Sequence, residues 1–452
     1  MLERLRIQNF KSWQDTGDMA FGSLTGFFGT NSSGKSSILQ FLLMLKQTVE
    51  SSDNSQVLNL GDEHSYVELG TMYDILFMHR DPESLSFSFD WKAKNLYSLT
   101  SEFWHEGKFY FSAKIERNED YVQLVDFRYQ NKNNITEGRR ANMKSKNNNP
   151  IYELHAIHGN YDSFEMERLV FESSKFYGVM PGSMSHVSNI EKKQFGAIGY
   201  SVFELEDFFR RTNYLGPLRE YPSRLYTWAG EQTRSVGNRG ERAIAALLSS
   251  RNQGPTIDVG EGQPKRTVEE HVAYWLKELG LIYSFKVQPI APNRKEYEVR
   301  IQRTAESASV FLTDVGFGVS QILPVLVLLF YVPEGSTVIL EQPEIHLHPA
   351  VQAGLADVFI DAIKRRKVQI ILESHSEHLL QRLQRRIAEE IISQEEIKLY
   401  FTSIEEGKSK LTTLKLDEYG NISNWPKGFF GDAFAEAAAK TKAEMKRKMR
   451  QQ

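Results

Sequence analysis

The 452-residue sequence predicts an α/β protein in which a mostly parallel sheet is flanked by helices, with a β-rich insertion and no long coiled coil. Three observations predict this class. A glycine-rich loop joins a strand to a helix near the N-terminus, strands and helices alternate over 304–403, and apolar and polar residues alternate with period two over parts of 51–213. Alternating strands and helices favour a parallel sheet, whereas period two favours antiparallel strands. Sustained heptads are absent from the sequence.

Composition excludes several kinds of protein. The 55 Lys and Arg residues nearly balance the 58 Asp and Glu residues, which argues against a surface that binds polyanions everywhere. The chain has no cysteine, so disulfides, thiolate nucleophiles and cysteine-ligated metals are excluded. The N-terminal segment has no long apolar run, and the longest apolar stretch, 322–332, is too short to span a bilayer. We therefore expect a cytoplasmic protein without a membrane partner.

The N-terminal segment, 1–50, is predicted to form one part of the α/β domain. Apolar residues recur between charged ones over 2–10, which is typical of a strand. A second strand over 24–28 leads into the glycine-rich loop, and an apolar face over 36–48 predicts a helix.

The next segment, 51–213, is predicted to be a β-rich insertion. Its strands are expected over 84–91, 108–115 and 121–129, where apolar and aromatic residues alternate with polar ones. The stretch 131–149 contains seven asparagines, five Lys or Arg residues and one acid, so we expect an exposed, mobile loop there.

The second half of the chain returns to α/β character. A mixed segment, 214–303, is predicted to contain two helices and a hairpin, and a second α/β lobe, 304–403, to alternate helices and strands. The C-terminal segment, 404–452, is predicted to end in a basic helix. The expected helices are 243–248, 268–279, 319–330, 351–365, 375–386 and 432–452, and the expected strands are 283–301 (a hairpin), 337–340, 368–372, 398–402 and 411–416.

The strongest motif is the glycine-rich loop, which fits the Walker A pattern G-x-x-x-x-G-K-[ST]. Its glycines let backbone N–H groups cradle phosphate oxygens, and the helix that follows directs its positive end at the same anion. Lys35 is expected at the β- and γ-phosphates, and the Ser36 hydroxyl on Mg²⁺. ATP and Mg²⁺ are therefore the predicted cofactors, and the predicted ATP-binding residues are Gly29, Thr30, Asn31, Ser32, Ser33, Gly34, Lys35, Ser36 and Ser37.

The second motif is the aliphatic strand over 337–340, which ends in the acidic residue Glu341. A carboxylate at the C-terminal end of a buried strand suits Walker B, so Glu341 is the candidate second Mg²⁺ ligand. The alternative is an ordinary core strand with a surface acid.

Two weaker motifs surround this strand. The segment 314–321 places two glycines and a serine at the start of a helix, which suits an anion-binding nest, although a plain turn would also explain it. His375 follows the next strand, where it can hydrogen-bond a γ-phosphate, although a structural histidine is the alternative.

In this order and spacing, the motifs resemble an ABC-type ATPase head. They resemble more closely the AAA-like branch that includes RecF, the SMC-like repair ATPases and the overcoming-lysogenisation-defect (OLD) ATPases. The opening 7–13 resembles the first strand of that branch, 343–349 resembles its D-loop segment, and 373–376 resembles its switch-histidine motif. Segments 214–219 and 425–431 resemble a bacterial subgroup with a C-terminal domain of unknown function. The residues that resemble the ABC signature are Gly316, Phe317, Gly318, Val319, Ser320 and Gln321.

The resemblance implies a homodimer, or a higher even oligomer, in which ATP lies between Walker A of one subunit and the signature of its partner. Gln342 stands where the family has the glutamate that activates water. Three interpretations remain: hydrolysis is slow, Glu344 is the base, or His375 is the base. We favour slow hydrolysis, because a glutamine can orient water but cannot accept its proton. The histidines and acids over 344–348 and 373–378 leave a transition-metal site as a minor alternative.

The resemblance also implies a biological role. OLD nucleases carry a Toprim domain after the ATPase, but only 77 residues follow His375 here, without its acidic pattern. We therefore expect a regulatory ATPase in anti-phage defence, acting as a sensor or scaffold for a separately encoded effector such as a nuclease. The alternative is a RecF-like ATPase that clamps DNA during repair. Its candidate nucleic-acid contacts are Lys132, Arg139, Arg140, Lys144 and Lys146.

Overall fold

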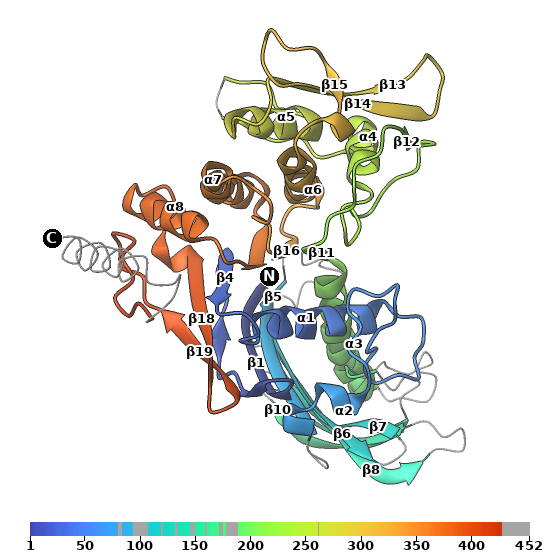
Figure 1. The fold of residues 1–452 in the computed structure, drawn as a ribbon. Coiled ribbons are helices and arrows are strands. Elements are labelled where there is room, and N and C mark those ends of the chain that lie inside the picture. The colour runs from blue at the N-terminus through green and yellow to red at the C-terminus, as the bar shows by residue number, and fades with distance from the viewer. Residues whose placement is uncertain are drawn as a thin grey trace, which may run out of the picture.

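The computed structural model describes residues 1–79, 84–93, 107–118, 121–131, 134–144, 150–158, 161–170, 175–177, 189–260 and 262–426. In these segments the chain forms a mostly parallel sheet, a large antiparallel sheet and a small antiparallel sheet, with helices packed around them (Figure 1). The predicted α/β class with a β-rich insertion is confirmed. No long coiled-coil arm occurs in the described segments.

The mostly parallel sheet carries the strands that end at the predicted motifs. Its order is β11-β16-β17-β4-β18-β19, in which only β19 runs antiparallel. The strand of the Walker A loop, β4, and the Walker B strand, β16, are therefore not neighbours, because β17 lies between them. The bounds are β4 Leu24–Gly29, β11 Thr212–Leu215, β16 Thr337–Glu341, β17 Gln369–Glu373, β18 Ile397–Glu405 and β19 Lys408–Leu414.

Helices cover both faces of this sheet because alternate strand residues enter two different apolar cores. Ile339 and Ile371 pack into the core that contains α1, whereas Leu340 and Leu372 pack into the core that contains α6 and α7. Figure 1 shows α1 and α3 on one side of the sheet and α6 and α7 on the other. The bounds are α1 Lys35–Glu50, α3 Asn189–Arg210, α6 Phe317–Tyr331, α7 Pro349–Arg366 and α8 Glu377–Ala388.

Helix α6 is buried along most of its length. Every residue from Val319 to Phe330 is buried, as its continuous apolar sequence predicts. No helix in the described part of the chain is long and apolar enough to span a membrane.

The antiparallel sheet begins with the N-terminal strand itself. Its order is β10-β9-β8-β7-β6-β5-β1-β2, with β3 paired to β1, so the first twenty residues belong to the same sheet as the β-rich insertion. Its inner face packs aromatic side chains such as Phe89 and Trp91 against Phe208 of α3. The bounds are β1 Leu2–Phe10, β2 Trp13–Asp15, β3 Met19–Ala20, β5 Ser84–Lys92, β6 Lys108–Asn118, β7 Tyr121–Asn131, β8 Asn134–Lys144, β9 Pro150–His158 and β10 Tyr161–Val170.

The prediction of a loop over 131–149 is wrong for most of that stretch. Residues Asn134–Lys144 form β8, which pairs antiparallel with β7 and with β9. Composition predicts a loop because asparagine, lysine and glycine have low strand propensity. Main-chain pairing on both sides of the segment outweighs that preference, since strand propensity depends strongly on context.

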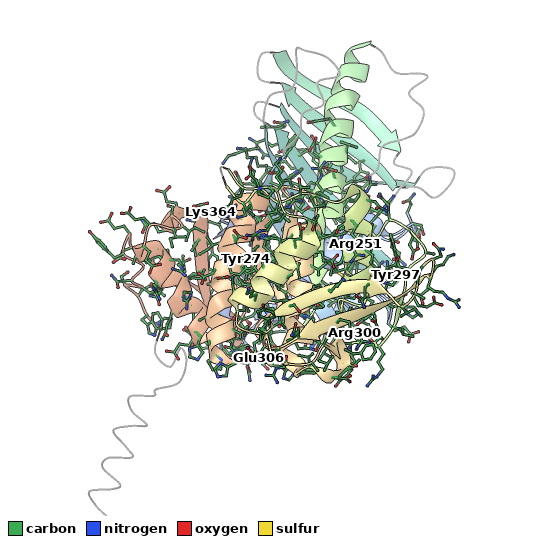
Figure 2. The ribbon with its side chains drawn as sticks, turned by 90° about the horizontal axis from the view of Figure 1, so that it is seen from above. Arg251, Tyr274, Tyr297, Arg300, Glu306 and Lys364 are labelled. Carbon is green, nitrogen blue, oxygen red and sulfur yellow. The ribbon has the colours of Figure 1, made fainter. Side chains whose placement is uncertain are left out.

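The small sheet, β12-β14-β13 with β15 on β14, lies over α4 and α5 (Figure 2). The remaining bounds are α2 Met72–Ile75, β12 Tyr226–Thr227, α4 Ala243–Gln253, α5 Val268–Glu278, β13 Ser284–Pro289, β14 Glu296–Gln302 and β15 Val310–Phe311. Short 3₁₀ turns occupy 77–79, 312–314 and 394–396. The predicted helix over 432–452 lies outside the described residues.

A close approach between Gly240 and α6 provides a test of the packing. Gly240 has a φ of +79°, and a Cβ there would lie 2.4 Å from Cβ of Pro324 in α6. Gly240→Ala should lower the free energy of unfolding by about 2–4 kcal/mol, from backbone strain plus the clash. Gly280, with a φ of +68° and open space around it, is the matched control, and Gly280→Ala should cost about 1–2 kcal/mol. Denaturant unfolding measures both, and equal losses would contradict the clash.

Candidate nucleotide-binding site

The Walker A loop has the backbone shape of an anion cradle. Gly29, Ser32 and Gly34 have positive φ angles of 142°, 60° and 92°, which turn the chain sharply between β4 and α1. Gly34 is the N-cap of α1, so the helix begins at Lys35. The loop borders a cavity of about 380 Å³, lined by Ser12, Asn31, Ser32, Ser33, Gly34, Lys35, Ser36, Ser37, Gln40, Gln342, Glu373 and His375.

Lys35 lies across this loop. Its Nζ donates hydrogen bonds to the carbonyl oxygens of Thr30, at 2.7 Å, and Gly29, at 3.2 Å. It also lies 3.9 Å from a carboxylate oxygen of Glu373. Burial lowers the pKa of Lys35, while the Glu373 carboxylate opposes that shift. The ammonium group is therefore held where the phosphate oxygens of a nucleotide would meet the loop.

Side chains from both ends of the chain brace the loop. Trp13 Nε1 donates a 3.0 Å hydrogen bond to the carbonyl oxygen of Gly34. The hydroxyls of Ser409 and Ser12 are bonded at 2.6 Å, and a Cβ at Gly34 would lie 2.5 Å from Ser409 Oγ. The hydroxyls of Ser33 and Thr402 also bond to each other. Glycine is therefore required at position 34 by space as well as by conformation.

Two carboxylates, the buried Glu373 and the partly buried Glu341, meet beside the loop because of strand register. The parallel pairing of β16 and β17 places Glu341 beside Glu373. The Ser36 hydroxyl donates a 2.7 Å hydrogen bond to Glu373, and the Tyr214 hydroxyl donates one of 3.1 Å to Glu341. Burial and then repulsion from Glu373 raise the pKa of Glu341 to about 7, and burial raises the pKa of Glu373.

This donor set fits Mg²⁺. Carboxylate and hydroxyl oxygens are hard ligands, and two close carboxylates gain from a divalent cation between them. Ser36 and Glu341 are the ligands expected from the sequence. Glu373, which the sequence suggested only as part of a minor transition-metal alternative, is the further candidate Mg²⁺ ligand. Its position at the C-terminal end of the strand beside β4 was the available signal.

Gln342 and His375 also line the cavity. Gln342 has a φ of 43°, a strained conformation for a residue with a side chain, and its N–H donates a 2.9 Å hydrogen bond to the carbonyl oxygen of Glu373. Burial, and then the Lys35 charge, lower the pKa of His375, which favours the neutral imidazole. Gln342 and His375 therefore face the same cavity as the phosphate loop.

Glu344 lies behind these residues. It is buried and does not line the cavity. Its Oε1 accepts a 2.6 Å hydrogen bond from the backbone N–H of His375, and burial raises its pKa. In this position the carboxylate supports the histidine main chain.

The segment that resembles the ABC signature lies at the start of α6, on the sheet face opposite α1. None of its residues lines the cavity around Lys35. Gly316 and Phe317 are exposed, Gly318 is partly exposed, and Val319, Ser320 and Gln321 are buried. The Ser320 hydroxyl donates a 2.8 Å hydrogen bond to the Phe317 carbonyl oxygen. Only the first half of the segment therefore faces solvent.

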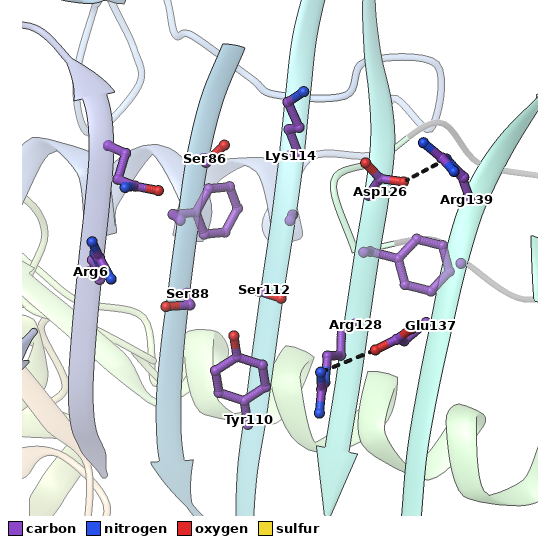
Figure 3. A pocket seen from close by; sticks show the side chains of 15 residues that line it. Arg6, Ser86, Ser88, Tyr110, Ser112, Lys114, Asp126, Arg128, Glu137 and Arg139 are labelled. Carbon is purple, nitrogen blue, oxygen red and sulfur yellow. Dashed lines mark ion pairs between the residues drawn. The ribbon is translucent and has the colours of Figure 1, made fainter. Parts of the chain in front are cut away.

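Of the candidate nucleic-acid contacts, Arg139, Arg140 and Lys144 belong to β8 of the antiparallel sheet, and Figure 3 shows the polar face of this sheet. Arg139 lies 3.6 Å from Asp126, and Arg128 lies 3.1 Å from Glu137. Opposite charges alternate across this face, so its potential is weaker than that of a basic groove. Lys132 and Lys146 lie outside the described residues, as do the side chains of Arg140 and Lys144. Within the described part of the chain, no group of three His, Asp or Glu residues is arranged to hold a transition metal.

Comparisons with known families match both halves of this site. A family model described as "AAA ATPase domain" matches residues 1–197, which include the Walker A loop. Residues 1–197 are therefore similar to an AAA-type ATPase domain. A second model, "AAA domain, putative AbiEii toxin, Type IV TA system", matches 264–381, which include the signature-like segment, Glu341 and His375. A third, "Protein of unknown function (DUF3696)", matches 392–439.

Solved structures with a similar arrangement include SMC heads. An SMC head bound to the C-terminal winged-helix domain of ScpA is 11% identical, with a TM-score of 0.44, and the match covers 92% of this chain and 98% of that one. The SMC head domain of Thermotoga maritima is 11% identical, with a TM-score of 0.37, covering 92% and 99%. The Pyrococcus furiosus SMC head with an extended coiled coil, bound to the C-terminal domain of ScpA, is 10% identical, with a TM-score of 0.41, covering 92% and 96%. No curated protein matches the chain.

The unexpected carboxylate provides a test of the metal site. Glu373→Gln should raise the Mg²⁺ concentration needed for half-maximal ATP hydrolysis by about 10- to 100-fold, because it removes one of two charged ligands. Glu377→Gln, at an exposed carboxylate four residues along the chain, is the control and should leave that concentration unchanged. A Glu373→Gln enzyme with the wild-type Mg²⁺ requirement would exclude Glu373 from the metal site.

Proposed function

We propose that the protein binds ATP and Mg²⁺ and hydrolyses ATP slowly within a head-to-tail homodimer. The observation that carries the proposal is the division of the site. The phosphate loop, Glu373, Gln342 and His375 share one cavity, and Glu341 lies beside Glu373 on the neighbouring strand, whereas the signature-like segment lies on the other face of the sheet. Each nucleotide would therefore contact the loop of one subunit and the signature-like segment of its partner.

Residues in and beside the cavity have separate roles in this reaction. The backbone N–H groups of the loop and Lys35 bind the β- and γ-phosphates, and Ser36, Glu341 and Glu373 hold the cation. Mg²⁺, when bound, offsets the negative charge of the phosphates. His375 donates a hydrogen bond near the γ-phosphate, and Gln342 orients the attacking water.

An exposed apolar surface beside the signature-like segment supports self-association. We call Leu218, Tyr221, Phe317 and His346 the signature surface. The rings of Tyr221 and Phe317 lie 5.8 Å apart, and those of Phe317 and His346 lie 5.1 Å apart. Leu218 is 71% exposed and Tyr221 is 72% exposed. Clustered exposed apolar side chains mark interaction sites, and a second copy of this chain is the proposed partner.

Slow turnover is proposed because Gln342 cannot accept a proton. The amide aligns water, as a glutamine does in small GTPases, but another group must remove the proton. Glu344 is less suited to that role than its sequence position suggests, because it is buried and bonded to the His375 main chain. A long-lived ATP-bound dimer suits a sensor or scaffold better than a rapidly cycling motor.

The proposed biological role is anti-phage defence with a separately encoded effector, such as a nuclease. It is supported by the resemblance to OLD ATPases and by the matched family description, which includes the words "putative AbiEii toxin".

Purified protein with Mg²⁺ or Mn²⁺ should leave plasmid DNA intact. Degradation would contradict the separate effector, and salt-sensitive DNA binding that depends on ATP would favour the RecF-like alternative.

The central test joins ATP hydrolysis with molecular mass in solution. ATP should produce a dimer or larger even assembly of the wild type, and Lys35→Ala should reduce hydrolysis by at least about 100-fold and abolish the assembly. Phe317→Ala should weaken the assembly, because it removes the centre of the signature surface. Tyr419→Ala, at a 67% exposed aromatic outside that surface, is the control. A wild type that remains monomeric with ATP would contradict the dimer.

Gln342→Glu tests the cause of slow turnover. A carboxylate at this place in the cavity can accept the proton of the attacking water, so kcat should rise by at least about tenfold. Gln342→Ala, which removes the amide without adding a base, should not raise kcat. A decrease in kcat for Gln342→Glu would show that Gln342 is not the limit on the reaction.

A further inference from the structure

Tyr214, in β11, reaches the Walker B carboxylate from the neighbouring strand. The parallel pairing of β11 with β16 places Tyr214 opposite Ile339, two residues before Glu341. Residues two apart lie on the same face of a strand, about 6.6 Å from each other along it. Tyr214 packs against the same core as Ile339, so it points to the face that carries Glu341. Its hydroxyl crosses the remaining distance and donates a 3.1 Å hydrogen bond to Oε1 of Glu341.

The surroundings of Tyr214 restrict the position of its hydroxyl. The ring packs edge-on against Tyr66, with ring centroids 6.2 Å apart. The hydroxyl lies over Gly216, where a Cβ would be only 2.9 Å from the hydroxyl oxygen. Gly216 is fixed in turn, because its N–H donates a 2.8 Å hydrogen bond to the carbonyl oxygen of Asn238. The hydroxyl is therefore held toward Glu341 by packing as well as by its hydrogen bond.

The two carboxylates of the metal site are held by different kinds of hydroxyl. Ser36, which bonds to Glu373, lines the nucleotide cavity and is itself an expected ligand of the cation. Tyr214 is not among the residues that line the cavity, so its effect on the cation must pass through Glu341. Hydrogen bonds of this kind orient metal-binding side chains, and the loss of one typically weakens metal binding by about 10- to 100-fold.

We propose that Tyr214 is a positioning residue of the metal site: its hydroxyl holds the Glu341 carboxylate in one orientation and thereby favours Mg²⁺ over Ca²⁺. This inference rests on the proposed function. Mg²⁺ requires near-octahedral geometry with short bonds, whereas Ca²⁺ accepts variable geometry and bidentate carboxylates. The hydrogen bond to Oε1 restricts rotation of the carboxylate, and a restricted ligand suits the stricter ion. A freely rotating Glu341 would bind Ca²⁺ nearly as before and Mg²⁺ less well.

Tyr214→Phe tests the hydroxyl, because it keeps the ring and its packing. The full-length protein binds a fluorescent, non-hydrolysable ATP analogue, whose fluorescence is followed as free Mg²⁺ or free Ca²⁺ is raised. Tyr214→Phe should raise the dissociation constant for Mg²⁺ by about 10- to 100-fold and that for Ca²⁺ by no more than about threefold. Tyr400→Phe is the control. The Tyr400 hydroxyl lies in the same core but donates a 2.8 Å hydrogen bond to the carbonyl oxygen of Ala20, so both constants should stay unchanged.

Two further variants test whether the effect passes through Glu341. Gly216→Ala moves the hydroxyl without removing it, because the new Cβ would lie too close to the hydroxyl oxygen. Mg²⁺ binding should weaken in this variant as well, with little change for Ca²⁺. In a Glu341→Ala background, Tyr214→Phe should have little further effect on Mg²⁺ binding, because the carboxylate that it orients is gone. Additive losses in that background would overturn the proposal.

The outcomes for the wild type separate this inference from the proposed function. If the wild type binds neither the analogue nor Mg²⁺, the ATPase proposal fails and this inference fails with it. If the wild type prefers Mg²⁺ and Tyr214→Phe keeps the same preference, only the role of Tyr214 is overturned. Equal weakening of Mg²⁺ and Ca²⁺ binding, with a lower melting temperature, would show a purely structural role and would overturn it too. Should Tyr214→Phe fail to fold, Gly216→Ala provides the same comparison.

Discussion

The parallel pairing of β16 with β17 is the constraint on which the candidate site depends. It places Glu341 directly beside Glu373, and β17 in turn lies beside the strand that enters the phosphate loop. A shift of this register by one residue would turn both carboxylates into the opposite core, because side chains alternate across a strand. The apolar residues before them prevent that shift, since Ile339 and Leu340 are committed to different cores. The hydrophobic pattern of two strands therefore determines where charge collects.

Two neighbouring carboxylates restrict which side chains can surround them. Buried acids are tolerated only where hydrogen bonds, cations or a metal offset them. Ser36, Tyr214 and Lys35 supply part of that offset by direct contact or proximity. A site of this kind has a lower electrostatic energy when a divalent cation is bound. Cation binding can therefore shift the conformational equilibrium of the surrounding loops.

Much of the fold could be predicted from the sequence because its elements have strong periodicity. Helix α6 is apolar from Ile322 to Tyr331, strands β16 and β17 each contain three consecutive aliphatic residues, and the Walker A pattern leaves little freedom for the chain around Lys35. The strand β8 could not be predicted, because its pairing comes from neighbours rather than from its own composition. Glu373 was included only in the minor transition-metal alternative, and not as a Mg²⁺ ligand, for a related reason. Its environment arises from strand order and burial, which no short motif encodes.

The phosphate loop and some of the residues that support it are far apart in the sequence, so they are synthesised at different times. The loop is made within the first forty residues, but Thr402 and Ser409, which contact Ser33 and the space beside Gly34, come near the end of the described chain. During translation the loop therefore emerges long before its supports. A nascent chain has no complete nucleotide cradle until β18 and β19 have left the ribosome and added to the sheet edge beside β4. Nucleotide capture would then report that the chain has been made and folded at least as far as β19.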